Sequence, residues 1–259
     1  MLNHLWQSTL FAGAVALLAL LFRENRAQVR SWLWLGASLK FLIPFSILLS
    51  LGSRFAPLSH SVAAQTDVPF SAVEIVQPFP AMPALHGRAS FAWIFAAALG
   101  VWICGLAAVA TIRFRAWLRI RDAGRSSILL DVPGCGIQVR CSPPGLLEPG
   151  VVGFFRPILL LPESLLERLT PAQFQAVLAH EMCHVHRRDN LASAIHMVVE
   201  AIYWFHPLVW WIGSRMVDER ERACDEEVCS QLCEPHEYAK AILDIYRWYL
   251  ESPLLCSAG

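Results

Sequence analysis

The sequence predicts a mainly α-helical membrane protein in which three transmembrane helices precede a small α+β domain. The first observation is composition: 56% of the 259 residues are hydrophobic and only 16% are charged, whereas charged residues make up about 25% of soluble domains. The second is that three segments are apolar and long enough to cross a bilayer, which takes about 20 residues. The third is a set of short apolar runs, separated by Pro and Gly, in the second half of the chain, which is typical of a small sheet.

The three predicted transmembrane helices differ in how clearly the sequence marks them. The first runs from about Leu5 to Phe22, the second from about Trp32 to Leu51, and the third from Phe91 to Ile112 without any charge. We interpret the first as a span rather than a cleaved signal peptide, because no Lys or Arg precedes it and no small-residue cleavage site follows it. Lys40 lies inside the second span, where it either snorkels to the interface or makes a polar contact among the helices; both readings stay open.

Arginines set the predicted orientation. Arg23, Arg26 and Arg30 follow the first span, whereas residues 53–90 contain only two arginines. Five more follow the third span: Arg113, Arg115, Arg119, Arg121 and Arg125. Because positively charged loops stay in the cytoplasm, the N-terminus is expected outside. The expected division is residues 1–52 with transmembrane helices one and two, 53–90 as an extracytoplasmic Pro-rich loop, 91–112 as transmembrane helix three, and 113–259 as a cytoplasmic domain.

The cytoplasmic part should begin with a small sheet and continue as helices. The runs "SILLDV", "GIQVRCS", "GVVGFF" and "PILLLP" predict strands, and "ESLLERL" predicts a helix. A clearer helix follows, because Thr170 can cap it, Pro171 suits its first position and Gln173 completes a capping box. A later helix should start near Asp189 or Asn190 and run to about Phe205, and another should start at Pro207. A last amphipathic helix is expected in "HEYAKAILDIYRWYL".

The capped helix carries the segment "LAHEMCHVHRRDN", which predicts a metal site. Each residue of a helix turns by about 100°, so His180, Glu181 and His184 fall within a single arc of the surface. Two imidazoles in that arc can hold one zinc ion while the glutamate reaches a water on it. The alternative is a pair of surface histidines on a helix.

The third metal ligand is predicted among the acids of "VDERERACDEEVC". Glu221 falls on a helical stripe that should be buried, together with Val217, Cys224, Val228 and Leu232. Glu219 and Glu226 fall on the opposite side, where a solvated charged face is the alternative for the whole run. An acid inside an apolar stripe is costly unless it is paired or bound to metal, so Glu221 is the predicted ligand. Asp225, at the edge of the stripe, is predicted to hold the free ring nitrogen of a zinc histidine.

The apolar segment between these residues, "AIHMVVEAIYWFHPLVWWI", constrains the topology. A single membrane crossing here would put His180 and Glu221 on opposite sides of the bilayer, where they could not share an ion. We therefore predict a buried or interfacial helical hairpin that breaks at His206-Pro207, because the residue before proline avoids the helical conformation.

Several motifs together resemble the BlaR/MecR family of membrane metallopeptidases, the beta-lactam sensor-transducers and their relatives. These are "LLEPGVVGFFRPILLLPESLLERLTPAQFQAVLAHEMCHVHRRDNL", "FHPLVWW" and "ERACDEEV", with "LWQSTLFAGAVALLALLFR" and "SWLWLGASLKFLIPFS" in the first two spans. The resemblance implies a gluzincin zinc-metalloprotease fold with Zn²⁺ held by His180, His184 and Glu221, and Glu181 as catalytic base. It also implies a protease domain on the cytoplasmic face of the bacterial inner membrane.

One departure from the family pattern limits what the resemblance implies. Family sensors continue through a fourth span into an extracellular penicillin-binding domain, whereas this sequence ends at "ESPLLCSAG". Beta-lactam sensing is therefore not carried over, and a truncated paralogue, a fragment or a subunit of a separate sensor all stay open. A homodimer is equally open, as is the residue that stabilises the oxyanion. The candidates for that role are His206, Arg222, His236 and Tyr238.

The expected function is that of an integral-membrane zinc endopeptidase in transmembrane signalling, with regulation of the kind found in antibiotic resistance. The resemblance implies that it cleaves a cytoplasmic transcriptional repressor or itself. A membrane-protein quality-control protease and a non-enzymatic zinc-containing transducer are the alternatives. The expected partners are the lipid bilayer and a protein substrate. Direct binding of nucleic acid is not expected, because the formal net charge is zero.

Overall fold

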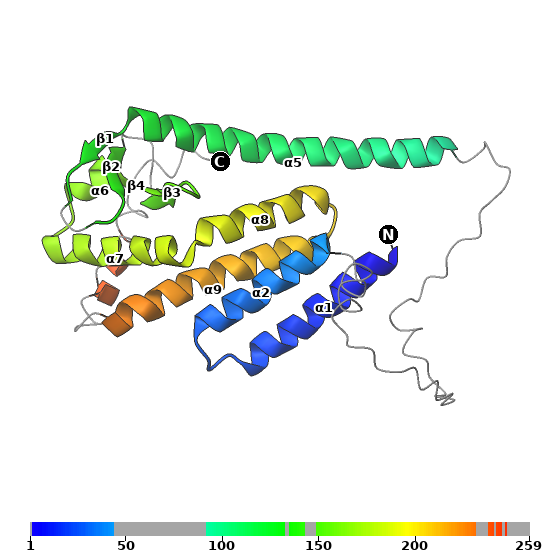
Figure 1. Ribbon diagram of the computed structural model, residues 1–259, viewed down its shortest axis with the longest axis horizontal. Helices are drawn as coiled ribbons and strands as arrows, with labels where there is room; N and C mark the ends of the chain where they lie inside the picture. Colours follow the sequence, from blue (N-terminus) through cyan, green and yellow to red (C-terminus); the bar gives the residue numbers. More distant parts are fainter. Residues whose placement is uncertain are drawn as a thin grey trace, which may run out of the picture. The chain divides into compact units, whose positions relative to one another are not determined.

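The computed structural model describes residues 2–43, 92–132, 135–142, 149–231, 238–240, 242–244 and 247 (Figure 1). Contacts divide the chain into two units. The first comprises Met1–Asn25, Val29–Val109 and His196–Met216, and the second comprises Arg26–Gln28, Ala110–Ile195 and Val217–Gly259. The predicted Pro-rich loop 53–90 lies outside the described residues.

The described part of the first unit is helical. Its helices are α1 (Leu2–Leu21), α2 (Ala27–Leu42), the apolar part of α5 (Ala92–Ser126), the end of α8 (Asp189–Ile202) and the start of α9 (Pro207–Gln231). Helices α1, α2, α8 and α9 form the core of this unit, which contains the buried residues Ala12, Val15, Trp34, Phe41, Val199, Val209 and Ile212. The break predicted at His206-Pro207 is present, and residues from both sides of it enter this core, which agrees with the predicted hairpin.

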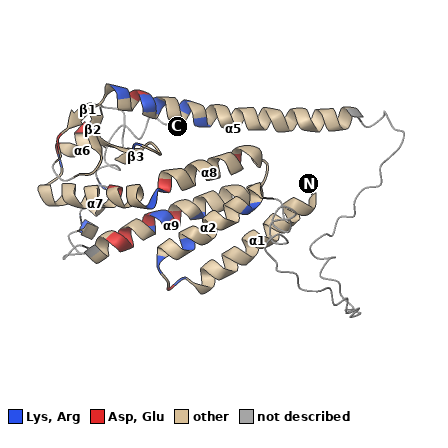
Figure 2. Cartoon of the chain, viewed as in Figure 1, with Lys and Arg blue, Asp and Glu red and all other residues tan. Residues whose placement is uncertain are grey.

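Two described helices are long and apolar enough to cross a membrane, Leu2–Leu21 and Trp93–Ser126. They correspond to the first and third predicted spans, and α5 continues past Ile112 as the basic helix on which the arginines lie (Figure 2). The second predicted span is described only as α2, which begins at Ala27, before Trp32, and ends at Leu42. The predicted residues 44–51 lie outside the described part of the chain.

The core of the first unit also contains polar side chains. The hydroxyl of Ser38 lies 2.8 Å from Nδ1 of His196, and Nε2 of that histidine lies 3.4 Å from a carboxylate oxygen of Glu200. Gly213 packs against this group so closely that an added Cβ would lie 2.5 Å from Nε2 of His196. Lys40 donates to the backbone carbonyl of Ile43, at 3.4 Å.

The second unit contains a four-stranded sheet of order β1-β2-β4-β3, which the sequence predicted as four short strands. Strand β1 (Ile128–Leu130) pairs antiparallel with β2 (Gln138–Ser142), and β2 pairs parallel with β4 (Ile158–Pro162). Strand β3 (Gly150–Val152) pairs antiparallel with β4 at the edge of the sheet. The residues of β4, a central strand, are all apolar, and Leu159, Leu160 and Leu161 are buried. A continuous apolar run is typical of a strand that is buried on both faces.

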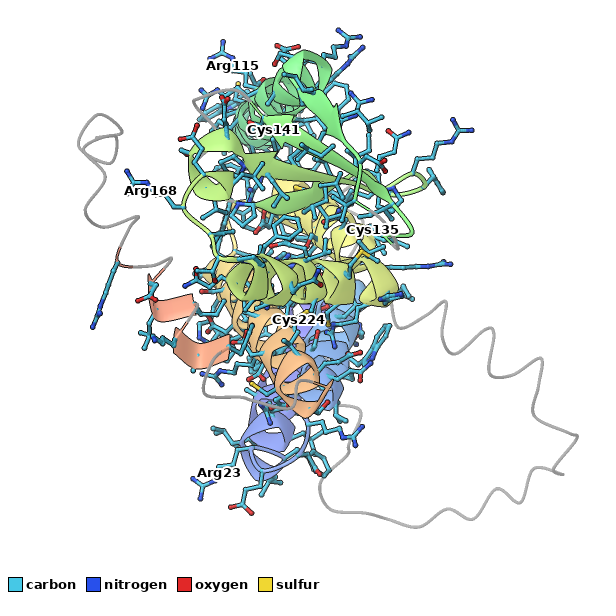
Figure 3. The ribbon with its side chains drawn as sticks, turned by 90° about the vertical axis from the view of Figure 1, so that its left-hand side faces the viewer. Arg23, Arg115, Cys135, Cys141, Arg168 and Cys224 are labelled. Atoms are coloured by element: carbon cyan, nitrogen blue, oxygen red, sulfur yellow. The ribbon has the colours of Figure 1, made fainter. Side chains whose placement is uncertain are left out.

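Helix α7 (Pro171–Arg187) lies between the sheet and the second half of α9 (Figure 3). One face, with Phe174, Val177 and Leu178, packs on the sheet and on Leu165 of α6 (Glu163–Leu166). Another face, with Ala176 and Ala179, packs against Val228 and Cys229 of α9 and against Tyr238 and Ile242.

The predicted capping box opens α7. The Thr170 hydroxyl accepts a hydrogen bond from the Gln173 backbone N–H at 3.3 Å, and the Gln173 side chain accepts one from the Thr170 backbone N–H at 3.0 Å. The box fixes where the helix starts, and therefore which of its residues face α9. The helix ends at Arg187, and the residue that caps it, Arg188, has a left-handed backbone with a φ of 57°.

Candidate metal centre

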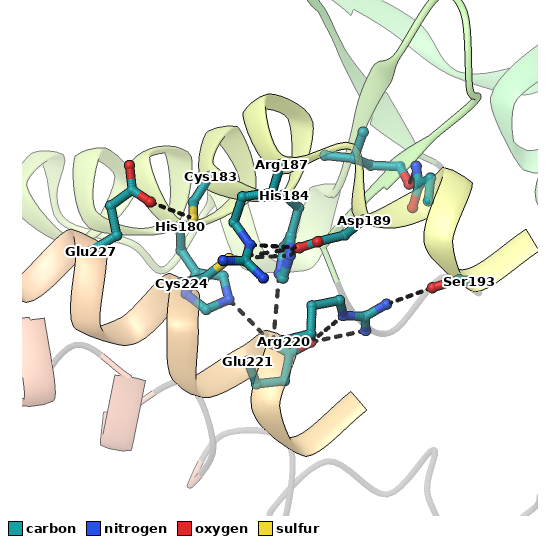
Figure 4. A network of polar contacts seen from close by, with 12 residues as sticks. His180, Cys183, His184, Arg187, Asp189, Ser193, Arg220, Glu221, Cys224 and Glu227 are labelled. Carbon is teal, nitrogen blue, oxygen red and sulfur yellow. Dashed lines mark hydrogen bonds and ion pairs between the residues drawn. The ribbon is translucent and has the colours of Figure 1, made fainter. Parts of the chain in front are cut away.

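Two histidines of α7 and one glutamate of α9 converge on one point (Figure 4). Nε2 of His180 lies 3.4 Å from Oε2 of Glu221, and Nε2 of His184 lies 3.6 Å from the same oxygen. One ligand atom from each residue lies within 4.8 Å of the others. The structure thus brings together the three residues predicted as ligands.

The other ring nitrogen of each histidine, Nδ1, lies within hydrogen-bond distance of a further side chain. Nδ1 of His180 lies 2.9 Å from the hydroxyl of Tyr238 and 3.2 Å from Oδ1 of Asp225. The Tyr238 hydroxyl donates to the same Asp225 oxygen, at 2.7 Å. Nδ1 of His184 lies 2.8 Å from Oδ2 of Asp189. A metal-binding histidine usually donates its other N–H to a carboxylate in this way, so both rings present Nε2 to Glu221.

Glu221 divides its two carboxylate oxygens between different partners. Oε2 faces the histidines, whereas Oε1 accepts hydrogen bonds from Nε and a terminal nitrogen of Arg220, at 3.0 and 2.9 Å. Arg220 also donates to the hydroxyl of Ser193, at 3.1 Å. The arginine therefore holds the glutamate in place without using the oxygen that faces the histidines.

These contacts shift the pKa values of the two histidines and of Glu221. Burial by itself lowers the pKa of His180, but hydrogen bonds with Asp225 and Glu221 outweigh it and raise the pKa to about 10. Burial likewise opposes the bonds of His184 with Asp189 and Glu221, which raise its pKa to about 9. For Glu221, burial raises the pKa, but the two histidines reverse this and hold it well below its ordinary value. These contacts therefore favour the protonated form of both histidines.

Glu181 lies beside the histidines and is 7% exposed. Burial raises the pKa of its carboxyl group, against the lowering effect of His184 and His180. The three predicted ligands and Glu181 line one cavity of about 460 Å³. The cavity is also lined by Pro149, Gly150 and Val151 at the edge strand β3, by Val177, Asp189 and Asn190, and by Val217, Arg220 and Ile242.

The predicted buried stripe on α9 is only partly correct. Cys224 and Val228 are buried, but Val217 is 48% exposed and the Glu221 side chain is 42% exposed, because both border the open cavity. Glu219, expected on a solvated face, is 7% exposed. The periodicity therefore selected Glu221 although the reason given, burial in an apolar stripe, was wrong; Leu232 lies outside the described residues.

Three residues around the centre were not predicted to contact the candidate metal ligands. Arg220 was not distinguished from the other charged residues of its segment, Tyr238 was predicted only as a candidate for stabilising the oxyanion, and Asp189 was predicted only as the start of a helix. Of the other oxyanion candidates, Arg222 is 59% exposed and bonds to Glu219, His206 lies 3.3 Å from the Thr9 hydroxyl, and His236 is outside the described residues. The position of Asp189, five residues after a metal-site histidine and across a helix end, was the one local signal available.

Comparisons with known proteins agree with the resemblance. The family model described as BlaR1 peptidase M56 matches residues 2–256. The chain is 26% identical to the Regulatory protein BlaR1 of Bacillus licheniformis over 204 residues, which covers 73% of this chain and 33% of that protein. It is 27% identical to the Methicillin resistance mecR1 protein of Staphylococcus aureus over 110 residues, which covers 42% of this chain and 17% of that protein.

The chain therefore spans only part of the length of these relatives, and their names describe the longer proteins. The match of the family model, by contrast, runs from the first helix to the last residues of the chain. The chain belongs to the BlaR1 peptidase M56 family.

Proposed function

We propose that this chain is an integral-membrane zinc endopeptidase with a regulatory role, and that its metal is held by His180, His184 and Glu221. The observation that carries the proposal is the convergence of two Nε2 atoms and one carboxylate oxygen within 4.8 Å at the wall of a cavity. Two imidazoles and a carboxylate are a donor set that catalytic zinc sites use, with a further position left for water or substrate. The donors present thus fit the ion.

The chemistry follows from the residues beside the ion. Zinc, when bound, would polarise the scissile carbonyl and make a water molecule more acidic. Glu181 accepts the proton of the attacking water and returns it to the leaving amine. Burial raises the pKa of Glu181, and a group that takes up and then releases a proton works best when its pKa approaches the working pH.

The regulatory role rests on the family. A relative in Bacillus licheniformis carries the name Regulatory protein BlaR1, and the substrate we propose is a cytoplasmic transcriptional repressor or the chain itself. The cytoplasmic location rests on charge, because arginines gather on α5 after its apolar part (Figure 2) and positive segments stay on the cytoplasmic side of a membrane.

The test compares cells that express the wild-type chain with cells that express Glu181→Gln, by proteome-wide identification of new protein N-termini. The matched control is Glu167→Gln, which changes an exposed glutamate by the same chemistry. We expect cleavage products in the wild type and the control that disappear in Glu181→Gln, while purified Glu181→Gln still binds zinc. Identical sets of termini in all three strains, with zinc bound, would instead favour a non-enzymatic transducer.

A further inference from the structure

Asp189 occupies an unusual place in the backbone. Among the described residues other than glycine, only Arg188 has a positive φ, at 57°. This left-handed conformation ends α7, and α8 begins at the next residue, Asp189. A left-handed residue other than Gly, Asn or Asp is uncommon, and such strain persists only where the surroundings hold it. The turn returns the Asp189 carboxylate to the last turns of α7.

The contacts of Asp189 concentrate on one oxygen. Its Oδ2 accepts from Nδ1 of His184 at 2.8 Å and from Nε of Arg187 at 3.3 Å, and the thiol of Cys224 lies 4.0 Å away (Figure 4). The Asp189 side chain is 7% exposed. A buried carboxylate is costly unless it is paired and hydrogen-bonded, and the shortest bond here joins it to the histidine.

We infer that Asp189 is a positioning residue for His184, an inference that rests on the proposed zinc site. By accepting the Nδ1 proton, Asp189 fixes the tautomer in which Nε2 keeps its lone pair and faces Glu221. It also fixes the plane of the ring, because Asp189 and Glu221 hold opposite nitrogens. His180 receives the same support from Asp225 and Tyr238, so each ring has its own carboxylate.

A purely structural role would give Asp189 a different task. In that case the carboxylate would only join the end of α7 to the start of α8 through Arg187. The two roles differ in what the loss of the charge does: a structural residue changes the stability of the fold, whereas a positioning residue changes the metal site itself. Measurements on the metal site therefore separate them.

The first readout is zinc affinity. The purified full chain is titrated with zinc against a chromophoric chelator, as wild type, Asp189→Asn and Asp189→Ala. Loss of a hydrogen-bonding partner behind a ligand weakens metal binding by about 10- to 100-fold, with the larger loss expected for Asp189→Ala. The control is Asp131→Asn, which removes an exposed carboxylate of the same unit. Asp189→Asn retains the shape of the side chain, so it gives a result even where Asp189→Ala does not fold.

The second readout is the visible spectrum of the cobalt-substituted protein, which reports ligand geometry. We expect changed d–d bands in Asp189→Asn and unchanged bands in Asp131→Asn. The inference is overturned if Asp189→Asn binds zinc within about twofold of wild type, outside the expected range, with the same cobalt spectrum.

His184→Ala separates this result from a failure of the proposed function. Loss of zinc in His184→Ala together with wild-type behaviour in Asp189→Asn rejects the positioning role alone. Retention of stoichiometric zinc in His184→Ala rejects the proposed ligand set, and the positioning role with it.

Discussion

Each histidine of the centre uses its two nitrogens for different purposes. Nδ1 of each ring binds a group that is not a predicted metal ligand, Asp189 for His184 and the Asp225–Tyr238 pair for His180. Nε2 of each ring meets Glu221. In the absence of metal these contacts favour the imidazolium ions, with pKa values of about 10 and about 9. The carboxylates that bind the two histidines therefore also raise the proton affinity of the rings, and these protons would compete with a metal.

This competition predicts that zinc affinity rises with pH. Both histidines bind a proton at neutral pH and must lose it before Nε2 can bind the ion, so each displaced proton steepens the rise by up to about tenfold per pH unit. The rise should continue until the pH passes the higher pKa, about 10 for His180. Chelator competition at several pH values measures the slope, and calorimetry in buffers of different ionisation heat measures the protons released. Affinity that is independent of pH, with no buffer dependence of the heat, would contradict the raised pKa values.

The ligand assignment gives a second prediction at the same scale. Glu221→Ala should lose zinc binding, because it removes the carboxylate oxygen that lies 3.4 Å from Nε2 of His180 and 3.6 Å from Nε2 of His184. The matched control is Glu226→Gln on the same helix, whose carboxylate accepts from the Ala27 backbone N–H at 2.8 Å instead. Elemental analysis of the two purified proteins gives the zinc content. Stoichiometric zinc in Glu221→Ala would mean that another group completes the site.

The elements that position the site were predictable where their signals are local. The capping box fixes the start of α7, and turn residues bound the four strands, so these features follow from neighbouring residues alone. The stripe on α9 was misjudged because periodicity assumes one buried face along a whole helix. In the structure Val209 and Ile212 of α9 enter the core of the first unit, whereas Cys224 and Val228 are buried in the second. A helix that serves two cores and a cavity has no single buried stripe to predict.

Partners that meet across a turn were not predictable for a different reason. Asp189 reaches His184 only because Arg188 adopts the left-handed conformation, and arginine gives no sequence signal for that. Tyr238 reaches His180 from a segment 58 residues further along the chain. The three residues of the candidate metal site could be predicted because helix geometry and donor chemistry restrict the choice strongly, whereas the partners of their second ring nitrogens depend on the tertiary fold.

The turn between α7 and α8 can be tested through Arg188, which is exposed. Arg188→Gly should raise the free energy of unfolding slightly, because glycine adopts a positive φ without steric cost. Arg188→Val should lower it, because the left-handed conformation costs an ordinary side chain about 1–2 kcal/mol and a β-branched one more. Thermal unfolding of the two purified variants in detergent measures the difference. Equal stability of the two would show that the turn does not hold this conformation in solution.

At the scale of the whole molecule, charge and hydropathy are separated along the chain. The apolar part of α5 is followed by five arginines on the same helix, and Asp122 is the single acid among them. Residues 53–90, which precede α5, carry two arginines and no lysine. This asymmetry of positive charge sets the orientation in which a protein inserts into the membrane. The orientation of the candidate metal centre is therefore expected to follow from α5, since the segment of the second unit that contains both histidines, Ala110–Ile195, begins within that helix.

This expectation is testable by labelling single introduced cysteines in intact bacteria with a membrane-impermeant thiol reagent. Ser71→Cys, in the predicted extracytoplasmic loop, should react in cells whose outer permeability barrier alone is opened. Ser126→Cys, an exposed position at the end of α5, should react only after the inner membrane is broken. The wild-type chain measures the background from its own cysteines. Labelling of Ser126→Cys in intact cells would put the metal centre outside, where a cytoplasmic repressor could not be its substrate, and the proposed substrate class would fail even if the chain proved to be a zinc peptidase.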